Sequence, residues 1–146
     1  DMAPMIFTKS IVSSKPLRIF NKGDMFRDFT YIDDIVDGIV KALDHTAEPD
    51  PTWTGKSPNP STSKAPYRVF NIGAHEPVHL LSFIETLEEA LGVEAKKQLL
   101  PMQAGDVPAT YANVDALEKV TGYKPSVSIK EGIGNFVKWY KDYNGV

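Results

Sequence analysis

The spacing of apolar and polar positions predicts that helices form a large part of the chain. Apolar residues that recur every three or four positions, together with residues that favour helix ends, predict five helices: 3–13, 35–45, 80–92, 113–123 and 128–143. Ser128 followed by Glu131 is a capping box, and Gly92 and Gly122 stand where helices commonly end. Asp33 or Asp34 is expected to cap the helix over 35–45.

Between these helices lie short runs that are rich in β-branched and aromatic residues. They predict strands at 17–20, 26–32 and 67–73, and a strand followed by a turn within 96–108. Short strands that alternate with helices are typical of an α/β fold. The stretch 44–66 holds five prolines and has no apolar period, so we expect a long surface loop there.

Composition and charge exclude several classes of function. The chain has 146 residues, a net charge of −3 and no cysteine. It therefore predicts neither a nucleic-acid-binding surface nor cysteine-ligated zinc, and the lack of cysteine favours the cytoplasm. No apolar run reaches the roughly 18 residues that a membrane span needs. The chain does not begin with Met, so we expect it to be a piece of a longer protein.

The stretch HEPVH, at 75–79, matches the zinc-binding pattern H-E-x-x-H. That pattern needs a helix, and Pro77 inside it is tolerated only in a helix's first turn. His45 is the only other histidine, so we expect a turn into the next helix rather than a metal site. Gly-x-Ser-x-Gly and the glycine-rich phosphate loops are also absent from the sequence, so we assign no catalytic residue.

Arg27 is a candidate binding residue, because it follows a glycine turn and opens a predicted strand. A guanidinium group there could act as a fork for phosphate or carboxylate. The alternative is a weak surface ion pair with Asp24 or Asp28.

Two further residues each allow two interpretations. Asp106, beside Gly105, could accept hydrogen bonds from vicinal sugar hydroxyls, or it could cap the helix over 113–123. Trp53, in the proline-rich stretch, could stack on a ligand, but we favour a role in packing the loop.

Several stretches together resemble a known family, and they follow one another in that family's order. They are RDFTYIDDIVDGIVKAL, SPNPSTSKAPYRVFNIG, LPMQAGDVPATYANVDALEKVTGYKP and EGIGNFVKWYKDY. The chain resembles the C-terminal part of extended short-chain dehydrogenase/reductases that act on nucleotide sugars. The proline- and serine-rich stretch and Gln103 are most similar to UDP-glucuronate 4-epimerases.

The resemblance implies a UDP-sugar site and a role for each residue in it. Arg27 would hold the diphosphate, the backbone at Arg18 and Phe20 would read the uracil, and Asp106 would face the ribose. Many relatives have Arg where this chain has Gln103, which would remove one phosphate contact.

The resemblance also implies what lies outside this chain. The family uses NAD, bound by a glycine-rich loop in an N-terminal half, and a Tyr-x-x-x-Lys pair; neither motif occurs here. Residues 1–146 would then be a truncated substrate-binding lobe with the last strand and helix elements of the Rossmann sheet. This chain alone would be inactive, and the parent protein would be a homodimer.

Two alternatives remain open at this stage. The parent protein could be another nucleotide-sugar epimerase, dehydratase or decarboxylase of the same family. The chain could also be a stand-alone nucleotide-binding module without catalytic activity.

Overall fold

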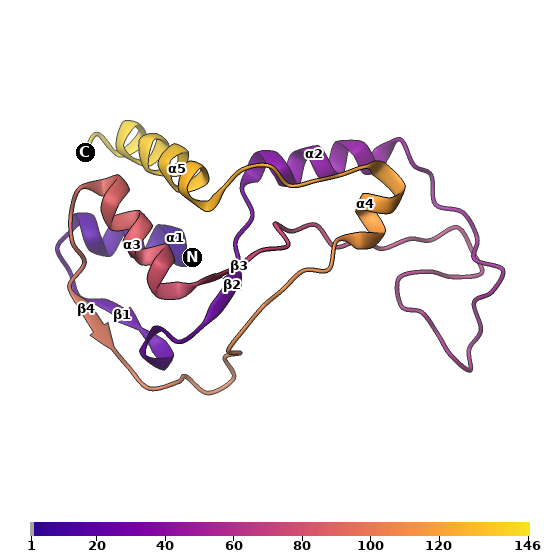
Figure 1. Ribbon diagram of the computed structural model, residues 1–146, viewed down its shortest axis with the longest axis horizontal. Coiled ribbons are helices and arrows are strands. Elements are labelled where there is room, and N and C mark those ends of the chain that lie inside the picture. Colours follow the sequence, from indigo (N-terminus) through magenta and orange to yellow (C-terminus); the bar gives the residue numbers. More distant parts are fainter. Residues whose placement is uncertain (1) are drawn as a thin grey trace. The chain divides into compact units, whose positions relative to one another are not determined.

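The computed structural model describes residues 2–146, which form helices and short strands, as an α/β fold requires (Figure 1). The elements, in chain order, are α1 (Ala3–Val12), β1 (Leu17–Ile19), η1 (Phe20–Gly23), β2 (Phe26–Asp28), α2 (Ile32–Leu43), β3 (Pro77–His79), α3 (Leu80–Leu91), β4 (Lys97–Leu99), α4 (Asp115–Thr121) and α5 (Ile129–Asn144). No helix among the described residues is both long enough and apolar enough to cross a membrane.

The described residues form two compact units, each made from separate stretches of the chain. The first unit consists of residues up to 29, together with 76–111 and 127–146. The second consists of 30–75 and 112–126. The first unit therefore contains all four strands, while the second contains α2, α4 and the proline-rich stretch.

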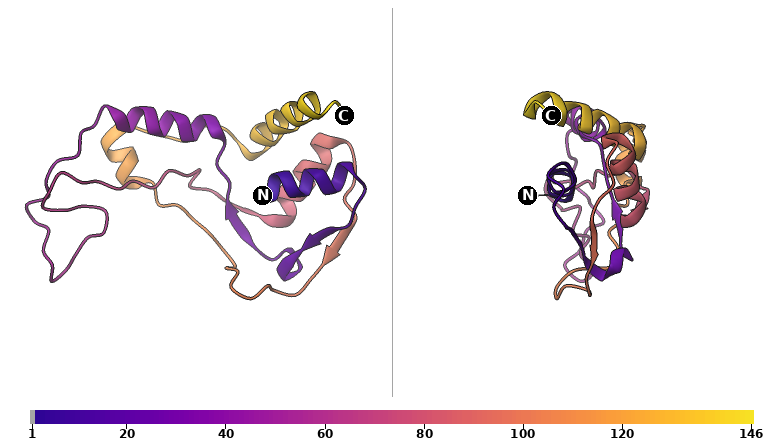
Figure 2. Two further views of the ribbon diagram at one scale, coloured as in Figure 1. Left: turned by 180° about the vertical axis from the view of Figure 1, so that it is seen from behind. Right: turned by 90° about the vertical axis from the view of Figure 1, so that its left-hand side faces the viewer.

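The core of the first unit lies around α3, which packs against both α1 and α5 (Figures 1 and 2). Phe83 of α3 stacks on Phe29, with ring centroids 4.1 Å apart, and meets Phe7 of α1 edge-on. The alternating residues Leu17 and Ile19 of β1 are buried in the same core. Burial of these apolar side chains provides most of the stability of such a core.

The strands of the first unit form two pairs. β1 lies parallel to β4, with Leu17 opposite Lys97, and β2 lies antiparallel to β3, with Arg27 opposite Val78. The other edge of β2 pairs with the chain near Ala109. β2 is therefore held on both sides by backbone hydrogen bonds.

In the second unit, α2 packs against α4, and Gly38 of α2 closely approaches two residues outside α4. A Cβ atom at this position would lie 3.1 Å from the ring of Tyr123 and 3.2 Å from Ile72. The buried carboxylate of Asp34 accepts hydrogen bonds from the backbone N–H and the hydroxyl of Ser126, at 3.0 and 3.2 Å. These contacts join α2 to the chain that follows α4.

The start of α2 differs from the sequence prediction. The strand predicted over 26–32 ends at Asp28, and the helix begins at Ile32 rather than 35. Tyr31 is the capping residue, and no side chain completes the cap. Asp33 and Asp34 lie in the first helical turn, where acidic side chains interact favourably with the helix dipole, so the prediction that one of them is the cap was wrong.

The strand predicted over 67–73 is absent from the described chain. Only an isolated bridge between Thr62 and Arg68 forms there, and the side chains of Tyr67 and Val69 are exposed. A strand needs a neighbour along its whole length that accepts and donates backbone hydrogen bonds, and within residues 2–146 this stretch has only that single bridge.

The helices predicted near 3–13, 80–92, 113–123 and 128–143 are confirmed, with bounds that differ by a few residues at most. The Ser128 hydroxyl accepts a hydrogen bond from the Glu131 N–H, as the capping box predicts. Gly92 and Gly122 adopt left-handed conformations directly after α3 and α4. Local signals were sufficient at these positions because the capping groups are close in the sequence.

Candidate functional site

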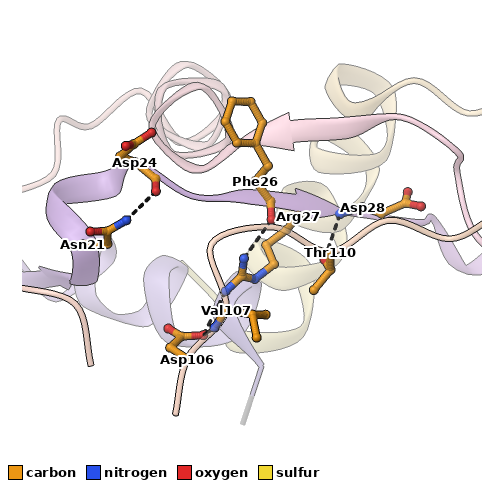
Figure 3. Close-up of polar contacts among 8 residues, drawn as sticks. All are labelled: Asn21, Asp24, Phe26, Arg27, Asp28, Asp106, Val107 and Thr110. Atoms are coloured by element: carbon orange, nitrogen blue, oxygen red, sulfur yellow. Dashed lines mark hydrogen bonds and ion pairs between the residues drawn. The ribbon is translucent and has the colours of Figure 1, made fainter. Parts of the chain in front are cut away.

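Arg27 lies at the centre of β2, and its guanidinium group makes two hydrogen bonds (Figure 3). Nη2 donates to Oδ1 of Asp106 at 2.9 Å, and Nη1 donates to the carbonyl oxygen of Phe26 at 2.8 Å. The side chains of Arg27 and Asp106 are 23% and 33% exposed. The ion pair is therefore accessible to a ligand, and its partner is 79 positions away rather than the neighbouring Asp24 or Asp28.

Asp106 is placed by a tight turn and by the chain that follows it. Its N–H donates to the Gln103 carbonyl, Gly105 has a positive φ of 82°, and Oδ1 also accepts from the Val107 N–H at 3.0 Å. The interpretation of Asp106 as a helix cap was wrong. Val114 is the capping residue of α4 and makes no side-chain cap hydrogen bond, while the side chain of Asn113 before it accepts from the Asp115 N–H.

The chain after Asp106 is hydrogen-bonded to the edge of β2, much as a third strand would be. The Phe26 N–H donates to the Pro108 carbonyl at 2.8 Å, and the Thr110 N–H donates to the Phe26 carbonyl at 3.1 Å. The Asp28 N–H also reaches the Thr110 hydroxyl at 3.4 Å (Figure 3). These bonds keep Asp106 beside Arg27.

The edge of β1 that faces away from β4 offers backbone hydrogen-bonding groups. The Leu17 N–H donates to Lys96 and the Ile19 carbonyl accepts from Leu100, so these alternate residues face β4. In a parallel ladder, the N–H and C=O of the residue between them point to the opposite side. The backbone of Arg18 therefore faces the edge that carries no strand within residues 2–146, and Phe20 begins η1 directly after β1.

The sequence-predicted site residues thus occupy two places in the first unit. Arg27, Asp106 and the backbone of Gln103 form one connected group. Arg18 of β1 and Phe20, the first residue of η1, form the second place, where the Arg18 guanidinium lies 5.2 Å from the centre of the Phe20 ring. Chain connectivity links the two places, because β4 runs directly into the segment 100–106.

The HEPVH stretch does not form a helix. Pro77, Val78 and His79 form β3, and α3 begins at Leu80. The ring of His79 packs edge-on against Phe26, with centroids 5.1 Å apart. Among residues 2–146, no group of three or more side chains is arranged to hold a metal ion.

The sequence predicted a glycine turn between β1 and β2, but it did not predict the left-handed backbone of the two residues before the glycine. Asn21, Lys22 and Gly23 all have positive φ, at 48°, 54° and 86°. We expected a positive φ at Gly23. Lysine has no preference for the left-handed conformation, so the sequence gives no reason to expect it at Lys22. The Lys22 N–H donates to the Leu100 carbonyl, a contact made only in the folded protein.

Together these features define a class of protein. An accessible guanidinium group suits an anionic group, a nearby carboxylate suits hydroxyl donors, and an open strand edge suits a ring with hydrogen-bonding groups. A nucleotide carries all three. Residues 3–73 match the family described as "NAD dependent epimerase/dehydratase family".

Relatives of known sequence support the same family over nearly the whole chain. The chain is 47% identical to "Protein CapI" of Staphylococcus aureus over 143 residues, which are 98% of this chain and 43% of the relative. It is 46% identical to a "Probable UDP-glucuronate 4-epimerase" of Rhizobium meliloti, over 96% of this chain and 41% of the relative. The chain thus spans about two fifths of the length of these relatives.

Solved structures agree with the fold. The chain matches a crystal structure of UDP-glucuronic acid 4-epimerase from Bacillus cereus, in complex with UDP-glucuronic acid and NAD, with a TM-score of 0.73 and 31% identity. The match covers 96% of this chain and 40% of that one. The present chain corresponds to the C-terminal part of such extended short-chain dehydrogenase/reductases.

Proposed function

We propose that this chain is the UDP-sugar-binding part of an NAD-dependent epimerase that interconverts UDP-glucuronate and UDP-galacturonate. The observation that carries the proposal is the accessible Arg27–Asp106 pair beside β2. It is supported by the similarity to an enzyme crystallised with UDP-glucuronic acid and NAD.

Each site residue has a proposed role that matches its geometry. Among residues 2–146, three of the five N–H groups of Arg27 have no protein partner, which leaves donors for the diphosphate. Asp106 would accept from the ribose hydroxyls, and the backbone of Arg18 and Phe20 would read the uracil edge. Gln103 would contribute its neutral side chain near the phosphates. Gripping the nucleotide in this way uses binding energy to position the distant sugar.

The sequence lacks the glycine-rich phosphate loop by which the family binds NAD. It also lacks the Tyr-x-x-x-Lys pair. We propose that the rest of the parent protein supplies both. NAD, when bound there, would accept the hydride from C4 of the sugar and return it to the other face.

Two features of the second unit support the idea that more protein packs against it. One face of α2 carries five exposed apolar side chains: Ile32, Val36, Ile39, Val40 and Leu43. The stretch 67–73, although rich in strand-forming residues, has no strand partner within residues 2–146. The N-terminal half of the parent protein would cover both. The proposal includes a cytoplasmic, homodimeric parent protein.

The binding part of the proposal is tested by calorimetric titration of the chain with UDP, beside Arg27→Ala. We expect UDP to bind the wild-type chain and the variant to lose at least tenfold in affinity, since a charged hydrogen-bond donor to phosphate is removed. Asp24→Ala, an exposed change on the same turn, is the control. Unchanged binding by Arg27→Ala would contradict the assigned site.

The catalytic part needs a complete enzyme. Residues 2–146 would replace the matching region of the Bacillus cereus epimerase, and the chimera would be assayed with UDP-glucuronate. We expect turnover by the chimera and none by the chain alone. Turnover of a different nucleotide sugar, with none of UDP-glucuronate, would favour another epimerase, dehydratase or decarboxylase of the family.

A further inference from the structure

A line of apolar residues runs along one side of α5, next to the buried face of that helix. Its members recur at alternating spacings of three and four residues: Ile129, Gly132, Phe136, Trp139 and Tyr143. The three rings follow one another, with the Phe136 and Trp139 centroids 6.0 Å apart and Trp139 stacked on Tyr143 at 5.4 Å. Such spacing is typical of a seam against which a second helix packs.

Only the first half of this seam is covered. Gly132 is buried, and Ile129 and Phe136 are partly buried against the core of the first unit. Trp139 and Tyr143, in contrast, are 49% and 76% exposed. Among the described elements, α3 alone packs extensively against α5. Two neighbouring aromatic side chains that remain so exposed indicate a surface that binds other protein.

The rim of the open half carries one charge of each sign. Lys138 and Asp142 lie one helical turn apart, both are exposed, and neither makes an ion pair within residues 2–146. In an antiparallel pair of identical helices, a twofold axis at the level of Tyr140 places each Lys138 beside Asp142 of the second copy. The same axis brings each Trp139 close to Tyr143 of the second copy. The open half of α5 is therefore complementary to itself.

We propose that α5 docks antiparallel against α5 of a second copy of this chain, through Trp139 and Tyr143. The contact is independent of the UDP-sugar site, to which α5 contributes no residue, and it assigns a contact surface within residues 2–146. The exposed parts of the two rings offer roughly 300 Å² on each copy. The buried total is then below the roughly 1,200 Å² of stable interfaces, so the dimer is weak and forms at about 0.1 to 1 mM.

The test measures the mass of the chain by sedimentation equilibrium, at concentrations from about 10 μM to about 1 mM. The chain carries Ile39→Lys and Leu43→Lys, which remove association through the exposed face of α2. We expect the average mass to rise from the 16.2 kDa of one chain toward twice that value. Addition of Trp139→Ala and Tyr143→Ala should keep the mass at that of one chain throughout.

Trp139 also reports directly on the contact. In the variant Trp53→Phe it is the only tryptophan, so its fluorescence is measured alone. As the concentration rises, we expect its emission to shift to shorter wavelength and its quenching by acrylamide to fall about twofold, because the second copy excludes water from the ring. This measurement needs no change in α2, so it remains decisive even where the α2 variant fails to fold.

The direction of the pairing is tested by charge reversal. Lys138→Glu and Asp142→Lys should each weaken the dimer about threefold to tenfold, since each places like charges side by side. The two changes together should restore the dimer, because opposite charges then meet again across the axis. Lys130→Glu is the matched control: it changes the net charge equally on the side of α5 near Glu89 of α3, and should leave the dimer intact.

Three results would overturn the proposal. A mass that stays at one chain up to about 1 mM, or that still rises without the Trp139 and Tyr143 rings, would show that this face does not pair with itself. Unchanged Trp139 emission while the mass rises would place the contact elsewhere. A double charge reversal that fails to restore the dimer would exclude the antiparallel arrangement.

Discussion

At the scale of single residues, the turn between β1 and β2 decides where Arg27 lies. Asn21, Lys22 and Gly23 adopt left-handed conformations in succession, which side chains other than glycine rarely do. The turn is held by the Asn21 side chain, which donates to the Asp24 carbonyl at 2.7 Å, and by the bond from the Lys22 N–H to Leu100. The backbone strain is concentrated where β2 begins, next to the candidate site.

Gly23→Ala should lower the free energy of unfolding by about 2 kcal/mol or more, as expected of strain combined with overpacking. A Cβ atom at this position would lie 2.5 Å from Cδ2 of Leu81, and φ is +86°. Gly92→Ala is the matched control, because its φ is +73° but nothing lies within 4 Å of the added atom. It should cost only about 1 kcal/mol. Urea denaturation measures the free energy of unfolding of both variants. An equal decrease in the two would contradict a role for the contact with Leu81.

At the scale of elements, the proline-rich stretch is an ordered loop despite its lack of apolar periodicity. Asp50 lies at its closure: the Asp50 N–H donates to the Ser63 carbonyl, and its carboxylate accepts from Thr52 and from the Thr62 hydroxyl. The Trp53 indole N–H donates to the Asn59 carbonyl within the same loop. This contact agrees with the favoured role for Trp53 in packing the loop.

The loop should loosen in acid. The hydroxyl of Thr52, followed by that of Thr62, holds the pKa of the Asp50 carboxyl below its ordinary value. A lowered pKa in the folded state means that the stabilisation is present above the unfolded value of about 3.9 and is lost as pH falls through the folded value. We expect the protection factors of the Asp50 and Thr52 amides, which are corrected for the intrinsic exchange rate, to fall below a pH of about 4. Asp50→Asn should remove this pH dependence, whereas Glu48→Gln, outside the network, should retain it.

At the scale of the whole molecule, the most informative feature is apolar surface that nothing in residues 2–146 covers. The exposed face of α2 repeats at helical spacing, which is the pattern of a face that packs against other protein. Gly38 and Asp34, on the other side of the helix, are buried within the second unit. The helix therefore has two packing faces, and only one of them has a partner here.

The chain alone should therefore bind a hydrophobic dye such as ANS, and the α2 face should account for most of the signal. The double variant Ile39→Lys and Leu43→Lys should lower the fluorescence by about half or more, because it places charge on that face. Val93→Lys, at an exposed apolar position of the first unit, is the control and should change it little. An unchanged signal in the double variant would contradict the assignment of α2 as the docking face.

Much of the local structure could be predicted from the sequence, because its causes lie within a few residues. The helical spacing in 80–92, the Ser128–Glu131 cap and the glycine after α4 all depend on neighbours along the chain. The resemblance likewise pointed to Arg27 and Asp106 as residues of one site, since each lies in a recognisable stretch. The ion pair itself was not predicted, because its partners are 79 positions apart.

By itself, the sequence determined the α/β class, most helix ends and the family that the chain resembles. Tertiary structure decided which residues pair over long distances and which extended stretches become strands. Residues 17–19 form a strand because residues 97–99 lie beside them, whereas residues 67–73 have strand-forming side chains but only a single isolated bridge within residues 2–146. A helix completes its hydrogen bonds within its own segment, while a strand completes them only with another part of the protein.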